Sequence, residues 1–200
     1  MTATAADYLW FAERYPDLAD AFCLTLVRDL APAEVLRRMG TRETTRLTGV
    51  ADVCRHYYAS EAPRGHPPLL VAATIIDGWT LAVEPNGFQG VTDAIVTSLS
   101  LGTKMVSLFR NVNAVSRFCW AEDGKVRLGF EPLFPTSREG SDANGLAELM
   151  QRVGFDLREG LDRDWEHHIE AAFALMEHVT GVRLTSEDLH SASYLCGTAP

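Results

Sequence analysis

The sequence predicts a single α+β domain over residues 1–200, in which a mixed, mostly antiparallel sheet of five or six strands is covered by helices. Two pairs, Asp77-Gly78 and Asp123-Gly124, separate apolar runs, and Asp-Gly pairs in this setting are typical of β-hairpins. Apolar residues at i, i+3, i+4 and i+7 near both ends of the chain predict helices, including a helical C-terminal quarter. Hairpins join antiparallel neighbours, so this pattern favours α+β over a doubly wound parallel sheet.

In the first quarter of the chain, the pattern of apolar residues predicts one strand among several helices. Residues 3–14 have helical spacing, and residues 22–27 form an apolar run typical of a buried strand. Pro32 suits the first turn of a helix that ends near Gly40, and Thr48 suits the cap of the next helix.

The middle of the chain changes to the period of strands. We expect strands at residues 69–76, 79–84, 103–109, 115–121 and 125–131, with a helix at residues 91–101 and a loop at residues 132–145. In the last quarter, apolar residues at helical spacing predict helices over residues 146–153 and 169–179, and Ser186 can cap a short final helix.

Composition narrows the class of protein. No stretch approaches the roughly 20 apolar residues of a membrane span, and the N-terminus lacks the basic start and apolar run of a secretory signal. The four cysteines form no C-x-x-C pair, which favours buried thiols in a reducing compartment. We therefore expect a cytoplasmic protein that does not bind membranes.

The net charge of −9 is unevenly distributed along the chain. Residues 142–190 hold eleven acidic residues and four arginines, a balance of −7. Such a chain is repelled by phosphate backbones, so nucleic acid is excluded as a partner and a basic protein is favoured. A solvated helical face is the alternative interpretation. The candidate partner-binding residues are Asp156, Glu159, Asp162, Asp164, Glu166 and Glu170.

One predicted strand–helix–strand unit breaks the hairpin pattern. If the strands at 79–84 and 103–109 run side by side in one direction, their carboxyl ends meet at one edge of the sheet, where ligands often bind. The segments Glu84–Phe88 and Arg110–Asn113 would converge there, with a stacking surface from an aromatic residue. The candidate ligand-binding residues are Trp79, Glu84, Asn86, Phe88, Arg110, Asn111 and Asn113. Alternatively, Glu84 and Arg110 form an ion pair and the asparagines only turn the chain.

Motifs for catalysis, metal or cofactor binding are not recognisable in the sequence. His167 and His168 are adjacent and point about 100° apart on a helix, which disfavours a shared metal. No G-x-S-x-G elbow and no phosphate-loop spacing occurs. We therefore predict no catalytic residue, no metal and no cofactor.

The strings GWTLAVEPNGFQG, LSLGTKMVSLFRNVNAVSRF and TGVRLT carry a resemblance. From about Leu9 to about His190, the chain resembles an uncharacterised family of actinobacterial single-domain proteins of about this length. The resemblance implies no activity, so no catalytic residue is carried over.

Three functional hypotheses follow. The first is a non-enzymatic protein-interaction module, immunity- or antitoxin-like, that binds a basic partner through its acidic surface. The second is a small-ligand-binding protein or enzyme that uses the Glu84–Phe88 and Arg110–Asn113 edge, with Glu84 as acid/base and Arg110 as anion clamp. The third is a homo-oligomer joined through a sheet edge or an apolar face.

Overall fold

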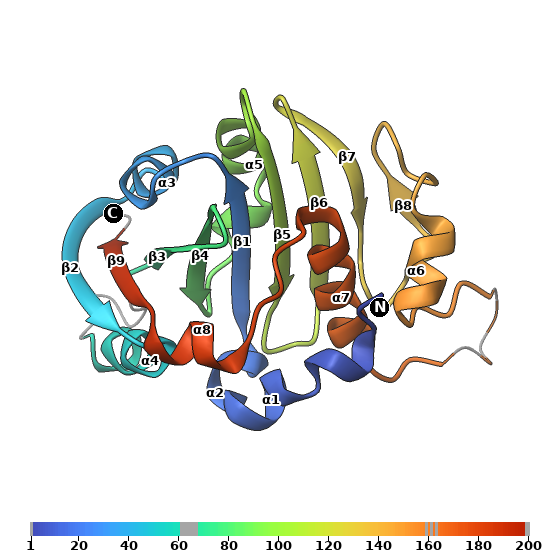
Figure 1. The fold of residues 1–200 in the computed structure, drawn as a ribbon, viewed down its shortest axis with the longest axis horizontal. Helices are drawn as coiled ribbons and strands as arrows, with labels where there is room; N and C mark the ends of the chain where they lie inside the picture. Colours follow the sequence, from blue (N-terminus) through green and yellow to red (C-terminus); the bar gives the residue numbers. More distant parts are fainter. Residues whose placement is uncertain (1, 61–67, 159, 161, 163, 199–200) are drawn as a thin grey trace.

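One open antiparallel sheet organises the molecule (Figure 1). The computed structural model describes residues 2–60, 68–158, 160, 162 and 164–198. Over those residues the sheet has nine strands in the order β2-β9-β3-β4-β1-β5-β6-β7-β8, and each pair of neighbours is antiparallel. The strands are β1 (Phe22–Arg28), β2 (Arg42–Thr48), β3 (Leu70–Ile76), β4 (Trp79–Pro85), β5 (Lys104–Arg110), β6 (Ser116–Glu122), β7 (Lys125–Phe130), β8 (Arg138–Glu139) and β9 (Ser193–Thr198).

The prediction of an α+β fold with a mostly antiparallel sheet is confirmed. The prediction that the sheet is mixed was wrong, because each pair of neighbouring strands among the described residues is antiparallel, and the predicted five or six strands were too few. The strands that sequence analysis missed are β2, β8 and β9. The polar sequence of β2, RETTRLT, lies at the edge of the sheet, where an apolar run is not required. β8 has only two residues and lies in the predicted loop, and β9 follows the helical quarter directly.

Helices lie on both faces of the sheet. They are η1 (Ala5–Tyr8), α1 (Trp10–Arg14), α2 (Pro16–Asp20), α3 (Pro32–Arg38), α4 (Val50–Ala59), η2 (Gln89–Val91), α5 (Asp93–Ser100), α6 (Ala147–Val153), α7 (His168–Thr180) and α8 (Ser186–Ser191). The helix predicted at 3–14 is divided into η1 and α1, and a further short helix, α2, begins at Pro16. The other predicted helices are present, with bounds shifted by a few residues.

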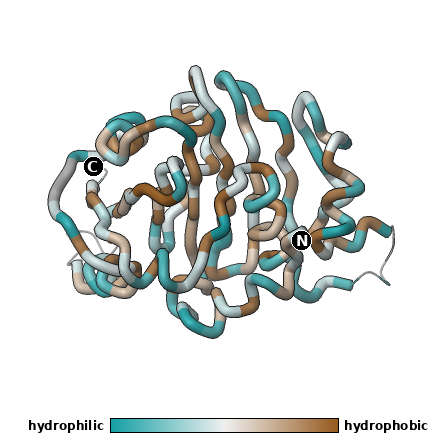
Figure 2. Tube along the Cα trace, in the orientation of Figure 1, coloured by the Kyte–Doolittle hydropathy of each residue, from teal (hydrophilic) through white to brown (hydrophobic). Residues whose placement is uncertain are grey.

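Alternation along the strands divides the core into two layers. In β1, Phe22, Leu24 and Leu26 face a large cluster that includes α4, α7 and α8. Val27 faces a smaller cluster on the other side, beneath α3 and α5. Figure 2 shows hydrophobic colouring along the central strands and hydrophilic colouring at the bottom of the view, around α2. In the part of the chain that the structure describes, none of the helices combines the length and hydropathy needed to cross a bilayer.

Candidate functional site

The predicted polar edge is formed only in part. β4 and β5 run in the same direction and end at the same edge of the sheet, because both are antiparallel to β1. The expectation that they lie side by side was wrong, since β1 lies between them. Cys23 of β1 pairs with Glu84 on one side and with Phe109 on the other. An inserted strand of this kind leaves no local signal in the β4–α5–β5 sequence.

Glu84 is enclosed at this edge rather than open to a ligand. The residue is 1% exposed, and its carboxylate accepts the backbone N–H of Gln89 at 2.8 Å and that of Gly90 at 2.9 Å. Burial raises the pKa of Glu84 to about 7, although the two backbone hydrogen bonds oppose this shift. Glu84 therefore holds the turn at η2 against the sheet.

Arg110 lies on the opposite face from Glu84. Arg110 pairs with Phe22, which faces the large core, whereas Glu84 pairs with Cys23, which alternates to the other face. The ion pair considered from the sequence is therefore not formed. Arg110 instead lines a hollow with Glu166 and Glu170, so the structure brings together members of the two predicted sites.

Most of the other predicted ligand-binding residues at this edge are buried in the core or form hydrogen bonds within the protein. Trp79 belongs to the core and is 7% exposed. Asn86 has φ 50° and donates to the Tyr57 hydroxyl at 3.3 Å. The side-chain oxygen of Asn111 accepts the N–H groups of Asn113 and Val115. Phe88 and Asn113 are exposed.

The predicted acidic surface contains carboxylates that are already engaged. Asp156 accepts hydrogen bonds from the guanidinium and N–H of Arg158 and from the N–H of Asp164. These bonds hold the pKa of Asp156 well below its usual range. Asp164 accepts the N–H of Glu166, and a Glu170 oxygen lies 3.9 Å from a His167 ring nitrogen. Asp162 and Glu166 are exposed, and Glu159 lies outside the described residues.

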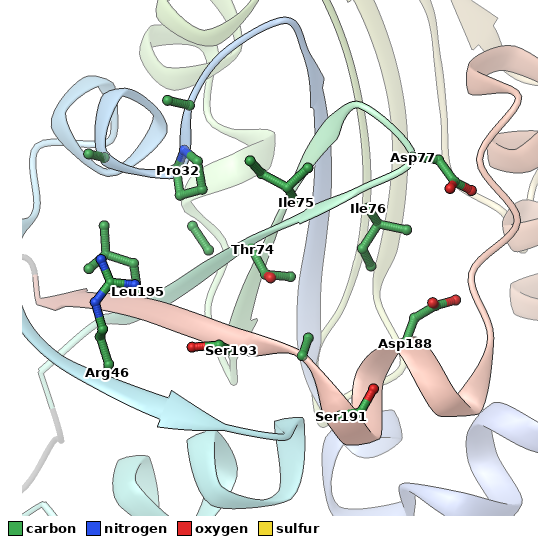
Figure 3. Close-up of a pocket in the computed structure, with 14 residues that line it drawn as sticks. Pro32, Arg46, Thr74, Ile75, Ile76, Asp77, Asp188, Ser191, Ser193 and Leu195 are labelled. Carbon is green, nitrogen blue, oxygen red and sulfur yellow. The ribbon is translucent and has the colours of Figure 1, made fainter.

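A site that sequence analysis missed lies where β3 and β9 separate. The two strands pair from Leu70↔Thr198 to Ala73↔Leu195 and no further. Beyond that point β3 continues against β4 through Ile76, while β9 continues against β2 to Ser193. Figure 3 shows the two ribbons diverging, with Thr74 and Ile75 on one side and Ser191 and Ser193 on the other.

This opening, the β3–β9 slot, has a volume of about 690 Å³. It lies between the start of α3 on one face of the sheet and α8 on the other. Its lining comprises Ala31, Pro32, Ala33, Arg46, Ala73, Thr74, Ile75, Ile76, Asp77, Asp188, Ser191, Ala192, Ser193 and Leu195. The side chains are therefore mostly small or apolar, with three charged groups among them.

The charges of the slot are separated. Figure 3 shows Asp77 and Asp188 at the end where the strands are far apart and Arg46 near the end where they meet. Asp77 is exposed in the hairpin turn, whereas Asp188 also accepts hydrogen bonds from the N–H and hydroxyl of Thr185. None of the lining residues is a candidate site residue in the sequence analysis, because β9 itself is not predicted there. The turn at Asp77-Gly78 was the only signal of its position.

Comparisons with known proteins give a family but no activity. A family model described as "Family of unknown function (DUF6461)" matches residues 1–200. No curated protein and no solved structure matches the chain.

Proposed function

We propose that this chain, which belongs to that family of unknown function, is a protein-binding module that accepts an extended segment of a partner in the β3–β9 slot. The observation that carries the proposal is the one-sided pairing of β3. Thr74, Ile75 and Ile76 pair with Leu81, Thr80 and Trp79 of β4, and their opposite side borders the slot.

Unpaired backbone makes this edge suited to another strand. In an antiparallel strand, successive residues direct their N–H and C=O groups alternately to the two sides. Among Thr74, Ile75 and Ile76, at least one residue therefore directs both groups toward the slot. A partner segment can bond to these groups by strand addition, in which the backbone supplies affinity and the side-chain pockets supply specificity.

The side chains of the slot favour an apolar residue in the incoming segment. Ile75 is 62% exposed, so its large apolar side chain is left uncovered beside the opening. Pro32 and Leu195 supply further apolar surface, and Ala192 and Ser193 are small enough to leave space. Covering this surface contributes roughly 25 cal/mol for each Å² of apolar area removed from water.

The charges favour a basic residue at one end of the segment. Asp77 and Asp188 lie on the two sides of the wide end of the slot, so a lysine or arginine that enters between them would be attracted to both. This is a narrower form of the basic partner expected from the net charge. Holding such a segment is compatible with an immunity- or antitoxin-like role, which is the class of function we propose.

The alternative of a ligand-binding protein or enzyme at the Glu84–Phe88 and Arg110–Asn113 edge has less support. Glu84 is buried with both carboxylate oxygens hydrogen-bonded, and Asn111 is occupied by its own turn. Arg110 lies on the other face of the sheet.

Peptide selection tests the proposal. Random peptides displayed on phage are selected on the wild-type protein and resynthesised, and their affinity is measured by fluorescence anisotropy. We expect enriched peptides to combine a lysine or arginine with a β-branched residue and to protect the Thr74–Ile76 amides from hydrogen exchange. Ile75→Lys should weaken binding at least about tenfold because it places a cation against the basic peptide.

Two further variants test whether the peptides bind in the slot or on another surface. Asp77→Asn keeps a side chain that tolerates the positive φ of 48° and should weaken binding in a salt-dependent manner. Val112→Lys is the matched control, because Val112 is an equally apolar residue, 71% exposed, on a loop away from the slot. Selection that enriches no peptide, or peptides that bind Ile75→Lys as tightly as the wild type, would overturn the proposal.

A further inference from the structure

The structure contains a second hollow, independent of the β3–β9 slot, to which we assign a different ligand. We propose that it binds a small zwitterion of the α-amino acid class with an apolar side chain. The hollow, named here the Arg110 hollow, has a volume of about 440 Å³. It is lined by Phe11, Ala12, Pro16, Ala19, Asp20, Arg110, Trp165, Glu166, His167, His168, Ile169 and Glu170.

The positive charge of this hollow comes from Arg110, the last residue of β5. Three carboxylates, those of Asp20, Glu166 and Glu170, line the same hollow, yet none of them forms an ion pair with Arg110. An arginine that only neutralised its neighbours would be held against one of them by paired N–H···O bonds. Its guanidinium is thus available to hold a carboxylate supplied by a ligand.

The start of α7 adds donors to the same hollow. The first backbone bond within this 13-residue helix runs from the N–H of Ala171 to the C=O of His167, so the preceding N–H groups have no partner inside the helix. The positive end of the helix dipole favours an anion here. His168 also lines the hollow, and its Nδ1 donates to the C=O of Trp165 at 2.9 Å. In this tautomer the buried Nε2, which has no hydrogen-bond partner among the described residues, is an acceptor that suits the ammonium end of a ligand.

The carboxylates supply the opposite charge. Asp20 and Glu166 are exposed at the hollow, and the Glu170 side chain is 17% exposed. A simple anion would meet these three negative groups, whereas a simple amine would meet Arg110 and the helix terminus. Because Arg110 and the three carboxylates line one hollow without pairing to each other, a ligand that carries both an ammonium and a carboxylate satisfies the most groups.

The rest of the lining determines the side chain of the ligand. Phe11, Pro16 and Trp165 form an apolar and aromatic wall, to which α1 and α2 each add one alanine. A volume of about 440 Å³ lies within the usual range of small-molecule pockets, which is about 300–1,000 Å³. An amino acid with an apolar or aromatic side chain therefore matches both the charges and the wall.

Isothermal titration calorimetry with three related compounds tests the assignment. L-Phenylalanine carries both charges, 3-phenylpropionate lacks the ammonium, and phenethylamine lacks the carboxylate. We expect phenylalanine to bind the full chain at least about tenfold more tightly than either analogue. Leucine should also bind, and glutamate should bind more weakly than both.

Variants of Arg110 and Glu170 test which residue binds the carboxylate of the ligand and which binds its ammonium group. Arg110→Met should weaken phenylalanine binding at least about tenfold and leave phenethylamine binding unchanged. Glu170→Gln should have the opposite effect: it should weaken the binding of phenethylamine and leave the binding of 3-phenylpropionate almost unchanged. Arg55→Met is the matched control, because Arg55 is exposed on α4 and pairs only locally with Asp52. Far-UV circular dichroism verifies that each variant is folded, and Arg110→Gln, which also removes the positive charge, serves as the replacement if Arg110→Met is not.

Three results would overturn the assignment. The first is the absence of binding by every amino acid at millimolar concentration. The second is equal binding of phenylalanine and of one single-charge analogue, which would mark the hollow as a plain anion or cation site. The third is binding of phenylalanine that the folded Arg110 variants leave unchanged.

Discussion

Glu84 accepts the backbone N–H of Gly90 at 2.9 Å, in the interior of the molecule and six residues along the chain. Gly90 in turn accepts a hydrogen bond on its C=O from the Ser107 hydroxyl at 2.7 Å, and Ser107 is paired with Thr25 at 2.7 Å. These contacts connect the turn after β4 with β1 and β5 through buried polar groups. The edge where we had expected a ligand is thus held together by its own side chains.

Glu84→Gln should alter the pH dependence of stability. Burial raises the pKa of Glu84 from 4.5 to about 7 in the folded protein, so between these values the folded state binds the proton more tightly than the unfolded state. Stability from this group is present at low pH and falls as pH rises from about 4.5 to 7, by on the order of 3 kcal/mol.

Urea unfolding of both proteins at about pH 5 and about pH 8 measures this effect. The advantage of wild type over Glu84→Gln should be larger at the lower pH, because glutamine cannot ionise. A difference between the two proteins that does not change with pH would show that Glu84 does not titrate in this range.

Gly90→Ala should destabilise the fold by roughly 1–3 kcal/mol, the usual cost of adding a methyl group to a filled core. A Cβ atom at Gly90 would lie 2.2 Å from the Thr25 hydroxyl oxygen and 2.9 Å from the Cys23 sulfur. Thermal unfolding measures the loss. The double variant with Thr25→Ala should recover part of it, and a fully stable Gly90→Ala protein would contradict the packing described here.

Tyr8→Phe should cost about 1–2 kcal/mol, because it removes the hydroxyl that donates to Glu177 at 2.6 Å and leaves a carboxylate without that partner. Tyr8 is 1% exposed and stacks on Phe173 with 5.4 Å between ring centres, and phenylalanine preserves that stacking. Tyr58→Phe is the control, since Tyr58 is 56% exposed and its hydroxyl makes only a 3.5 Å contact. Chemical denaturation compares the two, and equal losses would argue against the Tyr8–Glu177 bond.

Asp156→Asn should loosen the segment that precedes α7. The Asp156 carboxylate accepts the N–H groups of both Arg158 and Asp164 and pairs with the Arg158 guanidinium. Removing its charge weakens all of these bonds, so we expect faster cleavage within residues 156–166 in limited proteolysis. Asp52→Asn, which affects only an exposed pair on α4, should leave the cleavage rate unchanged.

Local patterns predicted most of the individual elements. The Asp77-Gly78 pair predicted the β3–β4 hairpin, and both residues have positive φ, 48° and 80°, as a tight two-residue turn requires. Helical spacing predicted α4, α5 and α7 in the same way. By contrast, β2 has no apolar run. It is an edge strand that pairs only with β9 among the described strands, so fewer of its side chains need to be apolar.

The candidate sites could not be predicted to the same extent. The direction of β4 and β5 and their shared edge followed from the sequence, but the strand between them did not. That strand places Glu84 and Arg110 on opposite faces. The β3–β9 slot depends on where pairing stops between Ala73 and Leu195, which are more than one hundred residues apart in the chain.

The sequence by itself determined the class of fold, the hairpins, most of the helices and the burial of the cysteines, because these depend on periodicity and turn residues within short windows. The tertiary structure alone decided which strands are neighbours, which side chains share a face and where the sheet opens. Those features depend on pairing and packing between segments that are distant in the chain. The pattern of apolar and polar residues within one segment does not show which distant segment it contacts.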